Sequence, residues 1–272
     1  MNAVNSHPIR TDESEIERLG LRHRVWRASV LDLWQRAGLR PGMTVIDAGA
    51  GPGHATFDLA GIVGPVGHVI ALERAPEFVM ALIMMAGARD IQNVAALQTD
   101  LADYAWPADI ADAVWCRWVL GFVTDARKVL GGIARALKPG GVVILHEYYD
   151  CGGLRLAPQS EAFETYLRQA VSHYRMGDGD PDIGLTLPEM LGECGLVVEF
   201  ARPAVFAVRP DDEMWQWPAT ATRAYSKMLA ESGVISIDES RAVDAILEER
   251  EADTNTLALT PGVLQIVARK PV

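Results

Sequence analysis

One short stretch constrains the fold more than any other part of the chain: Val-Ile-Asp-Ala-Gly-Ala-Gly-Pro-Gly, residues 45–53. It begins as an apolar strand ending in a carboxylate, and three glycines then follow at alternate positions, Gly49, Gly51 and Gly53. Residues 54–63 have the apolar spacing of a helix, so the glycine turn joins a strand to a helix N-terminus. Backbone without side chains lets a ligand lie directly against it. Such a unit is typical of the nucleotide cradle in doubly wound α/β proteins.

The details of the glycine turn favour one kind of ligand. The dinucleotide fingerprint needs a small residue at its sixth position. Counted from Gly49, that position holds His54; counted from Gly51, it holds Thr56. Residues 48–60 contain no Lys or Arg, so the phosphate-binding P-loop pattern is absent. We therefore expect a nucleoside without phosphates, with a tight structural turn as the alternative.

Five segments resemble the class I S-adenosylmethionine-dependent methyltransferases in order and spacing. The pattern Asp-x-Gly-x-Gly-x-Gly, starting at Asp47, resembles the first motif of that family. The other segments resemble its later strands and turns, at residues 69–73, 94–101, 111–120 and 137–145. Together they cover about residues 40–150. Residues 184–195 extend the match toward small-molecule enzymes similar to the quinone-biosynthesis methyltransferases.

The resemblance implies a set of cofactor-binding residues. In that family an acid after the second strand holds the ribose hydroxyls, and the matching residue here is Glu73. An acid after the third strand accepts a hydrogen bond from the adenine amine, and Asp100 matches it. Independently of the family, Glu73 lies about twenty residues past the glycine turn, where an adjacent strand brings a carboxylate to a ribose. The predicted S-adenosylmethionine contacts are Asp47, Gly49, Gly51, Gly53, Glu73, Arg74, Asp100, Leu101 and Arg117.

The periodicity of the chain predicts a core with two insertions. Strands alternate with helices in the core, which is typical of a parallel sheet covered on both faces. The predicted fold is α/β, doubly wound and Rossmann-like, with a mostly parallel seven-stranded sheet, an N-terminal helical segment and a helical cap. In chain order we expect a helical segment, the cofactor-binding core, a cap insertion, more core, a second cap insertion and the last core strand: residues 1–39, 40–150, 151–183, 184–208, 209–258 and 259–272.

Both insertions begin at the carboxyl edge of the predicted sheet, where ligands of open α/β sheets bind. We therefore interpret them as a helical cap over the substrate. The predicted substrate contacts are aromatic: Tyr149, Tyr174 and Trp217. The alternative is that these rings only fill the core of the cap. Residues 177–181, Gly-Asp-Gly-Asp-Pro, are expected to be mobile without ligand and less mobile when substrate is bound.

Methyl transfer needs few catalytic groups, because the sulfonium carbon is already electrophilic and holding the nucleophile in line supplies much of the acceleration. A hydroxyl acceptor also needs a base. His146 is the predicted base, since it ends a strand that faces the cofactor crevice and histidine titrates near the working pH. A hydrogen-bonded core histidine is the structural alternative. His173 and Tyr174 are rival bases.

The composition predicts a cytoplasmic enzyme. The 272 residues include 36 acidic and 25 basic side chains, and the net charge of −11 argues against nucleic acid as a partner. The three cysteines are too far apart for a metal knuckle, so no metal is expected. Residues 1–14 lack the apolar core of a signal peptide, and the longest apolar run, residues 78–88, is too short to cross a membrane. A homodimer is left open.

The predicted function is S-adenosylmethionine-dependent methyl transfer to a small molecule, at the oxygen of an aromatic or polyketide-like substrate. N- or C-methylation of a small metabolite is the nearest alternative. Two other classes remain, an NAD(P)-dependent oxidoreductase and a module that binds S-adenosylmethionine without catalysis. His54 and Thr56 disfavour the former. The complete set of cofactor residues and the elaborate cap disfavour the latter.

Overall fold

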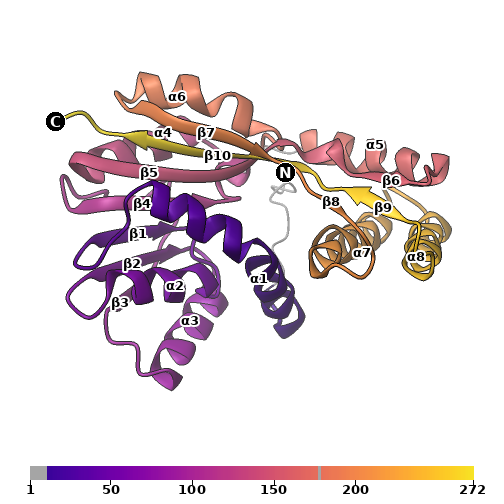
Figure 1. The fold of residues 1–272 in the computed structure, drawn as a ribbon, viewed down its shortest axis with the longest axis horizontal. Helices are drawn as coiled ribbons and strands as arrows, with labels where there is room; N and C mark the ends of the chain where they lie inside the picture. The colour runs from indigo at the N-terminus through magenta and orange to yellow at the C-terminus, as the bar shows by residue number, and fades with distance from the viewer. Residues whose placement is uncertain (1–10, 177–178) are drawn as a thin grey trace, which may run out of the picture.

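The computed structural model describes residues 11–176 and 179–272. Figure 1 shows a twisted sheet with helices on both faces and a smaller, mostly helical unit at one end. Two sequence predictions concern residues outside this range: part of the N-terminal stretch, residues 1–10, and part of the loop expected to move, residues 177–178.

The main sheet has seven strands in the order β3-β2-β1-β4-β5-β10-β7. Strands β1 to β5 pair in parallel, and β10 runs in the opposite direction, since it pairs antiparallel with both β5 and β7. Consecutive apolar residues form the central strands because helices cover both faces. The predicted fold class is confirmed. The strand bounds are β1 Thr44–Ala48, β2 His68–Glu73, β3 Val94–Gln98, β4 Ala111–Arg117, β5 Leu137–Asp150, β7 Val197–Ala204 and β10 Gly262–Arg269.

Helices cover both faces of the sheet. On one face, α1 (Glu13–Arg36) and α2 (His54–Val63) bury Trp26 and Leu59 against the strands. Beside them, α3 (Pro76–Ala88) packs through Leu82. The opposite face is covered by α4 (Ala126–Ala136) and α6 (Leu187–Glu193). Single turns of 3-10 helix lie at η1 Leu120–Phe122, η2 Cys151–Gly153, η3 Ile183–Leu185 and η4 Glu213–Trp215.

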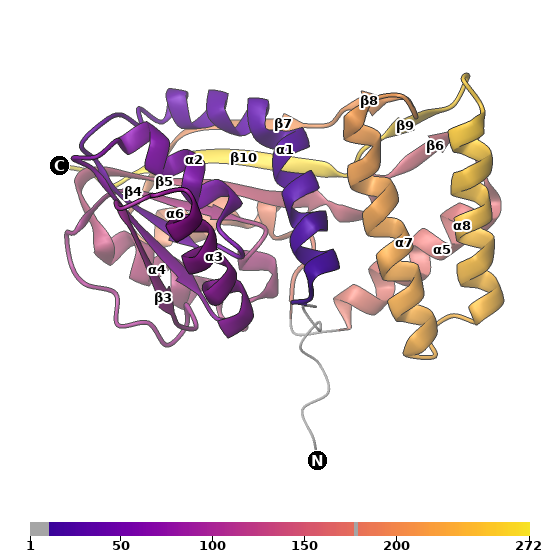
Figure 2. The same ribbon diagram turned by 90° about the horizontal axis from the view of Figure 1, so that it is seen from below.

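The smaller unit, which we call the cap, stands at the carboxyl edge of the sheet (Figure 2). It contains three helices, α5 (Glu161–Arg175), α7 (Gln216–Glu231) and α8 (Ile237–Ala252). The cap has its own core, in which Phe163, Trp215 and Leu247 are buried. Figure 2 also shows the first half of α1 lying between α2 and α7, so α1 lies between the sheet and the cap.

A three-stranded antiparallel sheet also belongs to the cap, in the order β6-β9-β8. Its strands are β6 (Arg155–Ala157), β9 (Leu257–Leu259) and β8 (Ala207–Val208). The sequence did not predict it, because strands of three, three and two residues are too short to show an alternating pattern. No helix in the described ranges is long and apolar enough to cross a membrane.

Candidate active site

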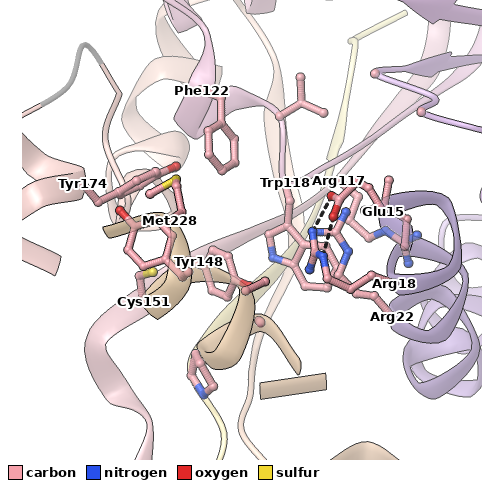
Figure 3. Close-up of a pocket in the computed structure, with 18 of the residues that line it drawn as sticks. Glu15, Arg18, Arg22, Arg117, Trp118, Phe122, Tyr148, Cys151, Tyr174 and Met228 are labelled. Atoms are coloured by element: carbon pink, nitrogen blue, oxygen red, sulfur yellow. Dashed lines mark hydrogen bonds and ion pairs between the residues drawn. The ribbon is translucent and has the colours of Figure 1, made fainter. Parts of the chain in front are cut away.

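A cavity of about 750 Å³ lies at the carboxyl edge of the sheet, between the strand ends, α1 and the cap. We divide its wall into two halves. The sheet half comprises the ends of β1 to β4 and the cavity-facing side of α1. The cap half comprises the start of η2 and the cavity-facing sides of α5 and α7. Figure 3 shows the charged residues of the sheet half on one side and the aromatic and sulfur-containing residues of the cap half on the other, with Trp118 and Tyr148 between them.

The three glycines of the turn have positive φ angles of 80°, 56° and 92°, for Gly49, Gly51 and Gly53. A Cβ atom on Gly49 would lie 2.3 Å from Cγ2 of Val119, and one on Gly53 would lie 2.7 Å from Cγ of Leu82. Packing therefore excludes a side chain at both positions. A Cβ atom on Gly51 would meet nothing within 4 Å, and Gly51 lines the cavity. The middle glycine thus leaves open space where a ligand can approach the backbone.

Glu73 fixes the shape of this turn. Its Oε2 accepts a hydrogen bond of 2.9 Å from the amide of Gly51, and its Oε1 accepts one of 2.8 Å from the amide of Ala75. The side chain is buried and lines the cavity. An ionised carboxylate has about four acceptor positions, so two remain for hydroxyl donors from a ligand.

Asp100 follows β3 and also lines the cavity, together with Leu101 and Arg74. The Oδ1 atom of Asp100 accepts a hydrogen bond of 2.8 Å from the amide of Ala102, which orients the carboxylate. Since the strands lie in the order β3-β2-β1-β4, four predicted cofactor residues lie along one edge in the order Asp100, Glu73, Gly49 and Arg117.

Two predicted cofactor residues do not line this cavity. Asp47 lies beneath the glycine turn, where it accepts a hydrogen bond of 2.7 Å from the hydroxyl of Thr56, and burial raises its pKa to about 6. It faces a separate cavity of about 50 Å³. Gly53 begins α2 and is packed against Leu82. Both residues therefore stabilise the conformation of the glycine turn without lining the cavity.

Arg117 takes part in a polar network that joins β4 to α1 and α2. Its Nη2 lies 3.1 Å from Nδ1 of His23, and Nε2 of His23 lies 3.1 Å from Oδ2 of Asp58. A guanidinium can only donate, so Nδ1 of His23 accepts and its Nε2 carries the proton donated to Asp58. Burial lowers the pKa of Arg117 to about 10.

His146 is not brought to the cavity. The ring is fully buried, with the rings of Trp26 and Trp118 edge-on at centroid distances of 4.7 Å each. Its Nδ1 lies 3.4 Å from Nε2 of Gln265, and burial lowers its pKa well below the usual value. The geometry therefore gives no support to His146 as the base, because Trp118 lines the cavity while His146 does not.

Among the predicted substrate contacts, Tyr174 and Trp217 line the cavity and Tyr149 does not. The ring of Tyr149 packs beside Gly262, where an added Cβ would lie 2.7 Å from its Cζ. Successive side chains of a strand point to opposite faces, so Tyr148 lines the cavity instead.

Several cavity residues were not among the contacts predicted individually from the sequence. In the cap half these are Cys151, Tyr166, Tyr225 and Met228, and at the junction Trp118, Phe122 and Tyr148. On α1, Glu15, Arg18 and Arg22 line the sheet half. The last three had a signal, since charged residues spaced three and four apart occupy one face of an otherwise apolar helix.

The cap half is aromatic and uncharged over most of its surface. The Tyr166 hydroxyl donates to the carbonyl of Thr222 at 3.1 Å, and the Tyr225 hydroxyl lies 3.1 Å from Nδ1 of His173. Burial raises the pKa of Cys151 to about 12, so its thiol is neutral at physiological pH. Burial also raises the pKa of Tyr174. A flat, largely apolar ligand suits such a wall.

Comparison with known proteins agrees with this geometry. Residues 39–183 match a family described as a methyltransferase domain. A ubiquinone/menaquinone biosynthesis C-methyltransferase from Vibrio campbellii is 32% identical over 147 residues, which cover 53% of this chain and 54% of that protein. The chain thus spans about half the length of this curated relative.

Two solved structures share the fold. A SAM-dependent methyltransferase from Aquifex aeolicus superposes with a TM-score of 0.52 and 20% identity, over 70% of this chain and 91% of the other. The phosphoethanolamine N-methyltransferase 2 of Haemonchus contortus, solved with S-adenosyl-L-methionine, gives a TM-score of 0.59 and 18% identity, over 96% and 59%.

The sheet order, the glycine turn and these matches define a class I S-adenosylmethionine-dependent methyltransferase. The chain belongs to the methyltransferase-domain family that matches residues 39–183.

Proposed function

We propose that this protein transfers a methyl group from S-adenosylmethionine to a small aromatic molecule. The cofactor lies in the sheet half of the cavity and the acceptor lies in the cap half. The observation that carries the proposal is the division of one cavity into a wall of backbone and charged groups and a wall of aromatic side chains.

The sheet half fits the cofactor from end to end. Asp100 lies beside Leu101 and Arg74 at the adenine end, and Glu73 has acceptor positions left for the two ribose hydroxyls. Gly51 leaves room at the backbone, and Arg117 stands at the amino-acid end. Asp47 and Gly53 act indirectly, through the shape of the turn.

When bound, S-adenosylmethionine supplies an electrophilic methyl carbon, and the protein's part is to orient the acceptor and exclude water. Near-parallel aromatic rings at the junction suit that task. The ring of Tyr148 lies at 26° to Trp118 and at 4° to Trp217, with centroid distances of 5.5 Å and 6.3 Å. A planar acceptor can stack against this wall.

Oxygen is our proposed acceptor atom, and the pair His173 and Tyr225 takes the role predicted for His146. Tyr225 lines the cavity, and its hydroxyl lies 3.1 Å from Nδ1 of His173. A proton leaving a phenol acceptor can pass through this hydroxyl to the imidazole. Replacing His173 by Gln, which keeps a hydrogen-bonding side chain, should lower turnover while leaving the affinity for S-adenosylhomocysteine unchanged.

Methylation at carbon is the second candidate. It is favoured by the name of the Vibrio campbellii relative and by the neutral thiol and phenols of the cap half. An aromatic carbon acceptor needs an electron-rich ring more than a strong base at the cap.

Two measurements test the proposal. Calorimetric titration should show binding of S-adenosylhomocysteine and none of NADH; the reverse result would identify an oxidoreductase. Incubation with methyl-labelled S-adenosylmethionine and a panel of phenols and aromatic amines should then label a product, and NMR of that product should show whether oxygen or carbon received the methyl group. Label confined to amines would contradict both candidates.

A further inference from the structure

Two arginines of the sheet half lie next to Trp118 at the junction. The guanidinium carbon of Arg22, from α1, lies 4.5 Å from the ring centroid of Trp118. That of Arg117, at the end of β4, lies 5.3 Å from a ring centroid of the same residue. Both line the cavity, and Figure 3 shows them side by side next to Trp118.

Each of these arginines has a buried N–H group without a hydrogen-bond partner, Nε of Arg22 and Nη1 of Arg117. In the described ranges 11–176 and 179–272, neither forms an ion pair with a carboxylate. Arg18, which lines the same cavity one helical turn before Arg22, differs, because its Nη2 pairs with Oε1 of Glu15 at 2.6 Å. Arg22 and Arg117 therefore combine a buried N–H group that has no hydrogen-bond partner with the absence of a matching anion, whereas Arg74, which also lines the cavity, is exposed.

The positive charge of the two groups is costly where they stand. Burial, together with the neighbouring charges of Arg18 and Arg117, lowers the pKa of Arg22 to about 9. Both groups are nevertheless charged at neutral pH. Leaving a buried cation and its N–H donors unpaired costs free energy that an anion at this position would recover.

We propose that Arg22 and Arg117 together bind a carboxylate, and that this carboxylate is the one at the amino-acid end of S-adenosylmethionine. The proposal rests on the proposed function for the placement of the cofactor. Along the strand edge, Asp100 and Glu73 lie on one side of the glycine turn and Arg117 on the other, since Ala48 pairs with Cys116. A cofactor with its adenosine over the two acids therefore directs its other end toward Arg117, where Arg22 approaches from α1.

This arrangement makes α1 part of the cofactor site. The helix α1 precedes the first strand, so it does not connect two strands of the sheet. It lies between the sheet and the cap (Figure 2). A carboxylate held by Arg22 and Arg117 joins α1 to β4 on the cavity side. On the opposite side, the contacts of His23 and Arg27 with Asp58 already join α1 to α2.

The test compares two sulfonium ligands that differ only in the carboxylate, S-adenosylmethionine and decarboxylated S-adenosylmethionine. The wild-type protein should bind the former about tenfold to a hundredfold more tightly, as expected for charge-assisted hydrogen bonds. Arg22→Met should weaken binding of S-adenosylmethionine by a similar factor and leave the decarboxylated ligand unchanged. Arg24→Met is the matched control, because Arg24 is on the same helix but exposed and outside the cavity; it should change neither affinity.

A second measurement separates binding from folding. Without ligand, Arg22→Met should melt no lower than the wild type, since it removes an unpaired buried charge. The rise in melting temperature caused by S-adenosylmethionine should become smaller. Equal weakening of both ligands by Arg22→Met, or a marked fall in the ligand-free melting temperature, would show that the arginine is structural.

A carboxylate that belongs to the substrate rather than to the cofactor would give a different experimental result. If Arg22→Met left the affinity for S-adenosylmethionine intact but raised the KM of a carboxylate-bearing phenol about tenfold, the site would belong to the substrate and our assignment would be overturned. Wild-type protein that bound neither sulfonium ligand would reject the proposed function itself. Wild-type protein that bound both equally would reject only the carboxylate site.

Discussion

The two halves of the cavity are built in different ways. In the sheet half the decisive groups are backbone: a turn with positive φ angles, the amides held by Glu73, and the ends of adjacent strands. In the cap half they are side chains from α5 and α7 that form an aromatic wall. Backbone geometry tolerates few sequences, whereas many combinations of side chains can line an apolar wall. The sheet half therefore tolerates few substitutions, whereas the side chains of the cap half can vary without disturbing the sheet half.

The substitution Gly51→Val, in the sheet half, should cause the largest loss of ligand affinity. The position has φ of 56° and faces open cavity, so a β-branched side chain would both strain the turn and fill the ligand's place. We expect the affinity for S-adenosylhomocysteine to fall at least a hundredfold, about 3 kcal/mol or more, by calorimetry. Gly61→Val, in α2 and free of neighbours within 4 Å, is the control and should bind normally. Undiminished binding by the Gly51→Val variant would contradict the placement of the cofactor in the sheet half.

Glu147→Gln tests the junction between the halves. The Oε1 atom of Glu147 accepts hydrogen bonds of 2.8 Å and 3.0 Å from the amides of Val119 and Leu120, and burial raises its pKa to about 7. The folded protein thus holds this proton at pH values where the unfolded chain has lost it. Stability from this group is complete below the unfolded pKa of 4.5 and is lost as pH rises through 7.

The wild type should therefore lose about 2–3 kcal/mol of unfolding free energy between pH 5 and pH 8 through this residue. The neutral Gln keeps an acceptor for both amides, so the variant should show a flatter pH dependence in urea unfolding. An unchanged slope would mean that Glu147 is not the titrating group.

Ala221→Phe places a large ring in the cap half, from α7. It should raise the KM for the aromatic acceptor about thirtyfold, roughly 2 kcal/mol, while the affinity for S-adenosylhomocysteine stays within about twofold of wild type. Ala245→Phe, on the exposed side of α8, is the matched control and should change neither quantity. A loss of cofactor affinity in Ala221→Phe would show that the halves are not independent.

Asp100→Ala should give the smallest effect, about 1 kcal/mol or a fivefold to tenfold loss of affinity for S-adenosylhomocysteine, from one lost hydrogen bond at an exposed site. The binding of 5′-methylthioadenosine should weaken equally, because both ligands carry the adenine. Asp103→Ala, exposed and outside the cavity, is the control. If only S-adenosylhomocysteine were affected, Asp100 would not contact the base.

The contrast between the halves also explains what the sequence could predict. The glycine turn and the acid of Glu73 were recognisable because strand, turn and strand end fix their relative positions. By contrast, a shift of one residue decides which face of a strand a side chain occupies. Tyr149 was therefore predicted to line the cavity where Tyr148 does. For His146 the reason is depth rather than face: it is on the same face as Tyr148 but two residues earlier, where it is buried beneath Trp118.

The cap posed a further difficulty for prediction. Its small sheet pairs β6, near residue 156, with β9, near residue 258, so the two segments are about a hundred positions apart along the chain. The local periodicity of the sequence does not indicate such long-range pairing. The position of Arg22 in the cavity depended in turn on where the cap leaves α1 uncovered, which only the assembled fold determines.

The small sheet continues the main sheet across three short connections, residues 151–154, 205–206 and 260–261. Two of them are bonded to each other, because the amide of Phe206 donates to Oγ1 of Thr260 at 3.0 Å and the amide of Thr260 donates to the carbonyl of Phe206 at 2.9 Å. The cap is thus joined to the main sheet along a row of strands rather than at one point. A change in the angle between the two sheets would have to bend all three connections together, because the paired bonds of Phe206 and Thr260 hold two of them side by side.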